Sequence, residues 1–249
     1  MQSIIRRIHK LFALHGFMGG FKLCAAKACR YLLWFTPSQR RARALAQDRD
    51  SEFDRKWGVD TSGTVVPRES KVVGSNWIYC NKYQSCNSAA LEQVISELPI
   101  QPEQFTFVDF GSGKGRALLA ASRFPFRRII GVEYSEQLNE IARRNVSRFP
   151  NTGRRCKEIE IVCADAARFP MPQGPLIIFL YNPFGGPLMT EVVRNVSTSF
   201  QEDPRRIIVL YANAVLADVW KNSGFMHEIR ASKWFAIYDT QACKESASA

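Results

Sequence analysis

The sequence lacks the residue patterns of common metal and disulfide sites. It has only three histidines, which lie far apart, at positions 9, 15 and 227. The seven cysteines are equally scattered, at positions 24, 29, 80, 86, 156, 163 and 243, and none forms a C-x-x-C pair. We therefore expect neither a metal site nor a disulfide framework. Free thiols are typical of a reducing compartment, so we expect a cytoplasmic protein.

Acidic residues are missing from the first 47 residues, which hold nine Lys or Arg. The whole chain has a formal net charge of +11, so the remainder carries only about +2. Because little charge is left there, a nucleic acid is an unfavoured partner for the main part of the chain. There is also no run of 18 apolar residues, so no segment is expected to span a membrane.

The basic N-terminal arm shows helical spacing of apolar residues in two stretches, roughly 4–15 and 21–35, separated by "GFMGG". Such basic amphipathic helices are candidates for peripheral membrane contact, here through residues 1–35. The same composition is also typical of a segment that steers an acidic macromolecule and of an organelle presequence. Alternatively, the helices pack on the rest of the protein and expose their charges to water.

Strand-like and helix-like segments alternate through the rest of the chain. Strands are expected at 105–110, 127–133, 158–163, 175–181, 205–213, 224–230 and 232–239. Helices are expected at 89–98, 115–124, 135–149, 187–200 and 215–224. This alternation predicts an α/β fold with a Rossmann-like, mostly parallel seven-stranded sheet. The last two strands are too close for a crossover helix, and so form an antiparallel hairpin that contains His227 as a structural residue.

These patterns suggest four parts of the chain. Residues 1–47 form the basic helical arm, and residues 48–104 form a connecting or cap segment, irregular over 48–75. The main α/β domain occupies residues 105–240, and residues 241–249 form a flexible tail.

A glycine-rich turn follows the first strand of the main domain, in "FVDFGSGKGR" at 107–116. It is not a P-loop, because Val108 and Gly115 stand where that motif requires Gly and Ser or Thr. It is not a dinucleotide fingerprint either, because its glycines follow a G-x-G-x-G spacing. Asp109, just before the turn, disfavours a pyrophosphate and favours a ligand that presents donors or a positive group.

Other special residues come at the ends of the next three strands. Glu133 ends the second strand, Asp165 follows the third in "CADA", and the fourth leads into "YNPFGGP". A strand-end carboxylate can accept two hydrogen bonds from a ribose diol, and Asp165 can accept from an adenine amino group. Open α/β sheets bind ligands at this edge, where the strands end.

Together, "VDFGSGKGR", "GVEYS", "CADA" and "YNPFG" resemble the motif series of the class I S-adenosylmethionine-dependent methyltransferases. With "FDRKWGVDTSG" and "FLYNPF", the chain looks more narrowly like a little-described bacterial subgroup, distantly like the seven-strand histone-lysine methyltransferases. The resemblance spans about residues 53–240. It implies S-adenosyl-L-methionine as the cofactor and a methyl-acceptor substrate.

By this resemblance, residues 109–115 wrap the methionine half of the cofactor, Glu133 holds the ribose and Asp165 faces the adenine edge. Tyr83 covers the amino-acid end. The full set of expected cofactor-binding residues is Tyr83, Asp109, Gly111, Ser112, Gly113, Gly115, Glu133, Tyr134, Asp165, Ala166 and Asn182.

The expected catalytic residues are Asn182, Pro183 and Phe184. The Asn182 side-chain carbonyl and the Pro183 backbone carbonyl can both accept hydrogen bonds from an amine and so orient its lone pair. Phe184 can flank a planar or alkyl acceptor. The motif resembles the N-P-P-[YF] motif of amino-group methyltransferases, but Phe184 replaces the second proline.

The expected function is methylation of an amine, on a protein lysine or another macromolecule, by in-line transfer. Two alternatives stay open: a methyltransferase of a lipid or hydrophobic small molecule at a membrane surface, and a non-catalytic cofactor-binding protein.

Overall fold

The computed structural model describes residues 44, 50–65, 79–232 and 235–241. By their internal contacts, residues 1–49 and residues 50–249 form two separate units. The predicted helices of the N-terminal arm and nearly all of the predicted tail lie outside the described residues. The following description concerns the second unit alone.

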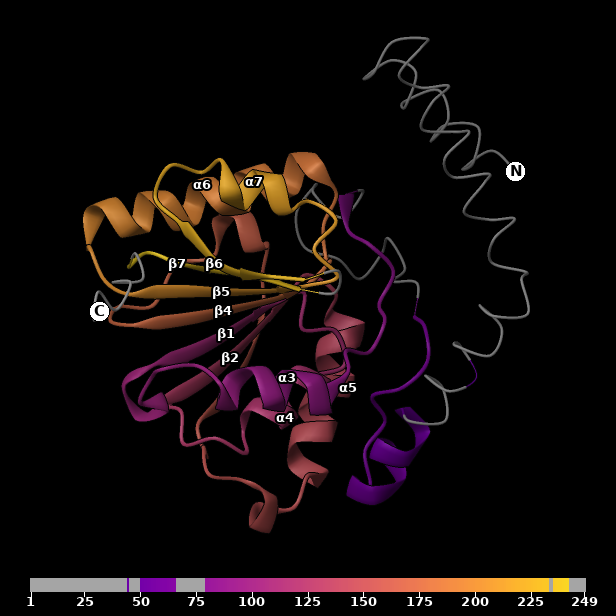
Figure 1. Cartoon of the computed structure of the whole chain (residues 1–249). Helices are drawn as coiled ribbons and strands as arrows, with labels where there is room; N and C mark the ends of the chain where they lie inside the picture. Colours follow the sequence, from indigo (N-terminus) through magenta and orange to yellow (C-terminus); the bar gives the residue numbers. More distant parts are fainter. Residues whose placement is uncertain (1–43, 45–49, 66–78, 233–234, 242–249) are drawn as a thin grey trace, which may run out of the picture. The chain divides into compact units, whose positions relative to one another are not determined.

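The second unit contains one seven-stranded sheet with the strand order β3-β2-β1-β4-β5-β7-β6 (Figure 1). The first five strands are mutually parallel, and β7 runs antiparallel to both β5 and β6. The predicted fold class is therefore confirmed. The strands are β1 Thr106–Phe110, β2 Arg128–Glu133, β3 Ile159–Cys163, β4 Leu176–Tyr181, β5 Ile207–Ala212, β6 His227–Ala231 and β7 Phe235–Asp239.

Helices cover both faces of this sheet. Figure 1 shows α3, α4 and α5 on one face and α6 and α7 on the other. Two helices begin at capping side chains, since Asn87 accepts from Ala90 N–H and Ser135 accepts from Leu138 N–H. The helices are α3 Ser88–Ser96, α4 Arg116–Ala121, α5 Glu136–Arg148, α6 Gly186–Glu202 and α7 Ala217–Lys221; short 3₁₀ turns occupy Pro102–Gln104, Asn151–Gly153 and Ala166–Arg168.

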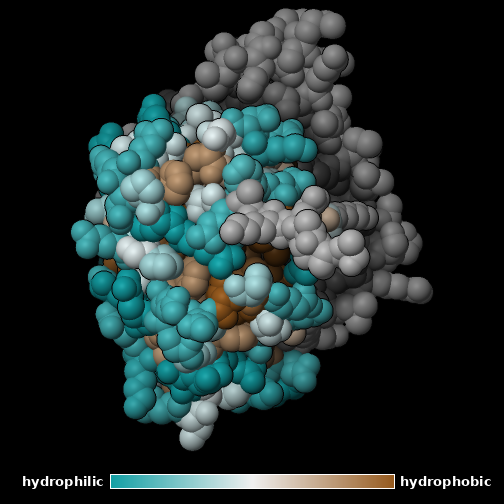
Figure 2. All heavy atoms as spheres, turned by 60° about the vertical axis from the view of Figure 1, so that its left-hand side comes forward, coloured by the Kyte–Doolittle hydropathy of each residue, from teal (hydrophilic) through white to brown (hydrophobic). Residues whose placement is uncertain are grey.

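The core lies between the sheet and its two helical layers. In β4, alternate residues such as Ile178 and Phe179 pack into opposite layers, and both are almost fully buried. The same holds along the other central strands, which explains why they read as continuous apolar runs. Figure 2 looks at the side where β1 and β4 begin, and shows a mostly hydrophilic surface with a hydrophobic patch near its centre.

One prediction was wrong. Residues 48–75 were expected to have little regular structure, but residues 50–57 are helical. The cause is visible in the packing, because Phe53 and Trp57, one helical turn apart, cover Val59, Leu119 and Phe149. Tertiary contacts thus stabilise a short helix whose polar composition alone does not favour it.

Replacing Ile178 by Ala should lower the free energy of unfolding by about 2–5 kcal/mol, because it leaves a cavity at a fully buried position. Replacing Val215, whose side chain is 62% exposed, should change stability by less than about 0.5 kcal/mol. Urea denaturation of the two variants measures both values. Equal losses would mean that β4 does not lie in the core.

Candidate functional site

The carboxyl ends of β1, β2 and β4 meet at a partly enclosed crevice with about 460 Å³ of empty space, some of it open to solvent. Residues before α3 complete its wall. The lining residues are Cys80, Asn81, Lys82, Tyr83, Gln84, Gly111, Glu133, Tyr134, Leu138, Tyr181, Asn182, Pro183 and Phe184. Residues expected from three separate motifs therefore come together at the edge where the parallel strands end.

The carboxylate of Glu133 ties the second strand to the glycine turn. Its Oε2 accepts a hydrogen bond from Gly113 N–H at 3.0 Å, and its Oε1 accepts from Ser135 N–H, also at 3.0 Å. Gly111 N–H donates to the Val132 carbonyl at 2.8 Å, which adds a second link between turn and strand. Since a carboxylate can accept about four hydrogen bonds, Glu133 retains acceptor capacity on the crevice side.

Burial changes the acidity of both carboxyl groups at this edge. Burial raises the pKa of Glu133 to about 7, although its backbone donors act in the opposite direction. Burial, and then the negative charge of Glu133, hold the pKa of Asp109 well above its usual range. At neutral pH, therefore, Glu133 is close to the midpoint of its titration, and the ionised form of Asp109 is disfavoured in the same direction.

At each glycine of the turn, a Cβ would meet a different neighbour. At Gly113, with a φ of +54°, a Cβ would lie 2.1 Å from Cδ2 of the Tyr83 ring. At Gly111, with a φ of +78°, it would lie 2.6 Å from Cβ of Pro183. These two glycines let an aromatic ring and the turn after β4 approach the backbone. Gly115 instead packs against Ala142 in α5.

The turn after β4 is held by the chain segment that precedes α3. Asn182 has a φ of +43°, in the left-handed region. Asn81 donates its backbone N–H to the Pro183 carbonyl at 2.8 Å and its side-chain Nδ2 to the Asn182 carbonyl at 2.7 Å. Cys80 and Phe184 form an isolated antiparallel bridge beside them. Asn182 itself is one of the residues that line the crevice.

Phe184 is less accessible than its expected role requires. Its side chain is 4% exposed and packs in the core with Leu188 and Met189. It does reach the crevice wall. Phe184 can therefore close one side of the crevice, but little of its ring is available for stacking.

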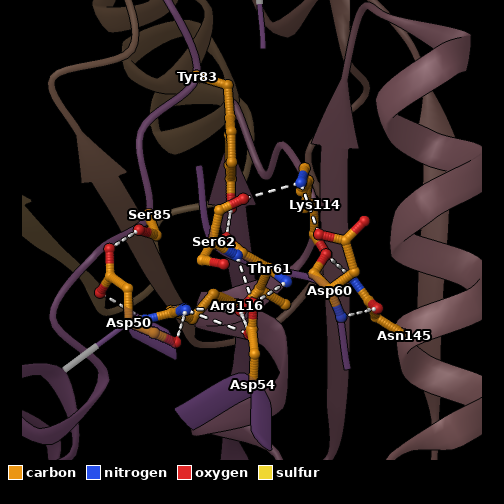
Figure 3. Close-up of polar contacts among 10 residues, drawn as sticks. All are labelled: Asp50, Asp54, Asp60, Thr61, Ser62, Tyr83, Ser85, Lys114, Arg116 and Asn145. Carbon is orange, nitrogen blue, oxygen red and sulfur yellow. Dashed lines mark hydrogen bonds and ion pairs between the residues drawn. The ribbon is translucent and has the colours of Figure 1, made fainter. Parts of the chain in front are cut away.

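A second set of polar residues, shown in Figure 3, holds residues 50–62 against the glycine turn. We call residues 50–62 the clasp. Its main contact is Arg116, which is 2% exposed and pairs with Asp50 at 2.7 Å and Asp54 at 3.2 Å. The Arg116 Nε also donates to Thr61 Oγ1 at 2.7 Å.

Lys114 makes the other half of the clasp contact. Its ammonium group donates to Asp60 Oδ1 and to the Ser62 carbonyl, each at 2.8 Å. Asn145 of α5 exchanges hydrogen bonds with the backbone of Asp60. Two cations of the glycine motif "GSGKGR" therefore bind the clasp instead of facing a ligand.

Tyr83 lies between the clasp and the turn. Its hydroxyl donates to the Thr61 carbonyl, and the Lys114 ammonium lies 5.9 Å from the centroid of its ring. Ser85 adds a hydrogen bond to Asp50 (Figure 3). Sequence reasoning missed the clasp because its residues resemble a polar linker. The apolar pair Phe53 and Trp57 at helical spacing, with aspartates on the same segment, was the available signal.

The remaining predicted residues lie around the crevice. Tyr134 lines it, whereas Asp109 and Ser112 are buried and are not part of its wall. Asp165 caps the 3₁₀ turn that follows β3, accepting from Ala167 N–H at 3.0 Å. Neither Asp165 nor Ala166 lines the crevice. Their roles, and those of the other site residues, stay predictions.

The described residues include no group of three or more His, Cys, Asp or Glu placed to hold a metal ion. Within the same ranges, no helix has the length and apolarity needed to cross a membrane.

Comparison with known proteins adds a family match. Residues 65–159 match the family model described as histone methylation protein DOT1. No curated protein matches the sequence.

Many solved structures are similar in fold, at low identity. A predicted N6-adenine-specific DNA methylase from Listeria monocytogenes is 13% identical, with a TM-score of 0.48, and the match covers 62% of this chain and 51% of that one. The ribosomal protein L11 methylase from Lactobacillus delbrueckii is 13% identical, with a TM-score of 0.44, and the match covers 70% of this chain and 82% of that one. An RNA methyltransferase from Salinibacter ruber, in complex with S-adenosyl-L-homocysteine, is 13% identical, with a TM-score of 0.41, and the match covers 62% of this chain and 91% of that one. The chain thus spans about half the length of the first of these proteins.

The expected resemblance to class I methyltransferases is confirmed by the family match together with the strand order. The predicted enzyme class, a methyltransferase, is confirmed by the same family match, whereas the cofactor S-adenosyl-L-methionine stays a prediction.

Replacing Arg116 by Met should destabilise the protein by about 3–5 kcal/mol, because it leaves Asp50 and Asp54 without their buried cation. The matched control is Arg123→Met, which removes a partly exposed ion pair with Glu92 and should cost less than about 1 kcal/mol. Urea denaturation measures the difference. If both variants unfold alike, the clasp is not held by Arg116.

Proposed function

We propose that this chain, a class I S-adenosylmethionine-dependent methyltransferase by its family match and strand order, methylates a nitrogen atom. The acceptor we favour is an amine on a protein, such as a lysine side chain, or on another macromolecule. The name of the matched family describes methylation of a protein, which supports a protein acceptor. The observation that carries the proposal is the position of Glu133, buried in the crevice wall and bonded to the glycine turn.

The residues of the crevice fit the cofactor. Glu133 has spare acceptor capacity for the two ribose hydroxyls, and Gly111 and Gly113 let Pro183 and the Tyr83 ring pack directly on the backbone of the turn. Tyr134 and Leu138 offer apolar surface to the adenine beside Glu133. Asp109, buried behind the turn, has a pKa raised well above its usual range by burial, which favours its neutral form beside the methionine end. When bound, the cofactor supplies a methyl group on a sulfonium, already electrophilic and in need of no covalent enzyme intermediate.

The protein's task is then to orient the acceptor. The Pro183 carbonyl already accepts from Asn81 N–H, and the Asn182 backbone carbonyl accepts from Asn81 Nδ2. The side-chain Oδ1 of Asn182 is therefore the acceptor best placed to receive an N–H of the substrate. One such acceptor can align the lone pair of an alkyl amine, whereas a planar amino group held by two N–H bonds needs a second acceptor.

Water is excluded by the segment that covers the crevice. The ring of Tyr83 covers Gly113, and Asn81 holds the turn after β4. The clasp keeps Tyr83 in that position through Thr61. Exclusion of water strengthens the hydrogen bonds that align the reacting atoms.

A lipid or hydrophobic small molecule at a membrane surface is the second acceptor class. The basic N-terminal arm favours it, by sequence alone. Removing residues 1–45 separates the two classes, since a soluble protein acceptor would still be methylated, whereas a membrane-bound acceptor would be lost together with binding to liposomes.

Binding of S-adenosyl-L-homocysteine should tighten about tenfold between pH 6 and pH 8. With a pKa of about 7, Glu133 is mostly protonated at pH 6 and mostly ionised at pH 8, and only the carboxylate accepts from both ribose hydroxyls. Calorimetric titration across this range measures the change. Glu133→Gln should bind more weakly and without this pH dependence. A wild-type chain that is folded yet binds nothing would remove the proposal.

Without ligand, the free energy of unfolding should change with pH in the opposite direction to the binding affinity. The pKa of Glu133 in the folded state is raised above its ordinary value. Its contribution to the free energy of unfolding is therefore complete below pH 4.5 and is lost as the pH rises to about 7. Binding and stability therefore change in opposite directions over the upper part of this range, which separates the ligand effect from a loss of folding.

Replacing Asn182 by Ala should lower methyl transfer by about a hundredfold, because the acceptor amine loses its orienting hydrogen bond. The measurement is tritiated-methyl labelling of a native lysate, followed by identification of the labelled species. The matched control is Asn213→Ala, because Asn213 has a similar φ of +49° but does not line the crevice. Equal losses in both variants, or labelling on an oxygen or carbon atom, would contradict the proposed role.

A further inference from the structure

We propose that the surface around Trp57 binds the phosphodiester backbone of a nucleic acid. This surface, which we call the basic surface, consists of Lys56, Trp57, Arg123, Arg148 and Arg155. None of these residues lines the crevice, although Lys56 and Trp57 belong to the clasp.

Contacts between four segments bring these residues together. The Lys56 ammonium lies 5.0 Å from the centroid of the Trp57 ring, and the Arg123 guanidinium lies 5.7 Å from it. The Trp57 and Phe149 rings are 4.9 Å apart, which places the adjacent Arg148 at the end of α5 beside them. Arg155 N–H donates to the Ser122 carbonyl at 2.7 Å, next to Arg123.

The cations of this surface are largely uncompensated. Lys56, Arg148 and Arg155 are exposed, and within the described part of the chain none of them makes an ion pair. The neighbouring acids are already engaged, since Glu92 pairs with Arg123, and Arg128 pairs with both Glu158 and Glu160.

The charge of the second unit is therefore unevenly distributed. Residues 123–157 contain nine Lys or Arg and three Glu, one of which is the buried Glu133. The chain after residue 47 has a small net charge, which by itself disfavours a nucleic acid as partner. That small value is the sum of the basic segment 123–157 and of an acidic remainder. The basic N-terminal arm, with its nine cations, continues in sequence into the helix that carries Lys56 and Trp57.

A polyanion fits this surface better than the other anionic partners. A membrane contact needs apolar anchors, but in the described part of the chain the one large hydrophobic side chain that is well exposed is Val215, which follows β5. A single peptide carboxylate on an exposed cation contributes only about 0–1 kcal/mol. A phosphate backbone engages several fixed cations at once and releases its condensed counterions, which gives useful affinity from exposed charges.

The basic surface is well separated from the crevice. The 13-residue helix α5 starts at Glu136, beside Glu133, and ends at Arg148, which corresponds to about 20 Å. Substitutions at Arg148 and Arg155 can therefore be tested for nucleic-acid binding without disturbing cofactor binding.

The experiment measures fluorescence anisotropy of labelled duplex DNA and single-stranded RNA, each about 30 residues long, with the full chain at about 50 to 200 mM salt. R148A/R155A should weaken binding about tenfold at the lowest salt and reduce the slope of log affinity against log salt by about 2. The control R194A/K221A removes two exposed cations from α6 and α7 and should leave both values unchanged. Affinity for S-adenosyl-L-homocysteine should be the same in all three proteins.

Three results would overturn the proposal. The first is no binding of either nucleic acid by the wild-type chain. The second is an equal loss in R148A/R155A and R194A/K221A, which would assign binding to net charge or to the arm alone. The third is binding only to anionic vesicles or to poly-glutamate. Because none of these readouts involves methyl transfer, failure here is distinct from failure of the proposed function.

Discussion

The crevice depends on one interaction, the pair of hydrogen bonds that the Glu133 carboxylate accepts from Gly113 and Ser135. These bonds join the end of β2 to the glycine turn after β1 and to the start of α5. They also keep a carboxylate in a place that is almost inaccessible to water, where its ionised form is disfavoured. A ligand that donates hydroxyl groups would relieve this cost, and so the arrangement that raises the pKa of Glu133 supports the proposed contact with a ribose.

The glycine turn is equally constrained from the other side. Arg116 and Lys114 form ion pairs with the clasp, and the clasp accepts a hydrogen bond from Tyr83, whose ring lies over Gly113. Asn81, close to Tyr83 in sequence, fixes the turn that presents Asn182. The glycine turn, the segment that carries Asn81 and Tyr83, and the turn after β4 are thus parts of one connected set of contacts. A change in any of them should affect the geometry of the others.

The sequence predicted the sheet well because its signals were local. The apolar run of β4 and the capping Ser135 each specify their own element, and strand-end residues such as Glu133 and Asn182 follow from the sheet topology. The clasp could not be predicted in this way. Its helix is stabilised by Trp57 against Phe149 and by Arg116 against Asp54, contacts between residues more than 60 positions apart. The engagement of the Pro183 carbonyl by Asn81 is likewise a long-range contact that no motif records.

The most direct measurement is a crystal structure of the protein with S-adenosyl-L-homocysteine. The account predicts that both ribose hydroxyls lie within hydrogen-bonding distance of the Glu133 carboxylate, with the amino-acid end against Gly111 and Gly113. It would be contradicted by a ligand bound elsewhere, or by a Glu133 carboxylate that contacts only Gly113 and Ser135 while the ligand occupies the crevice.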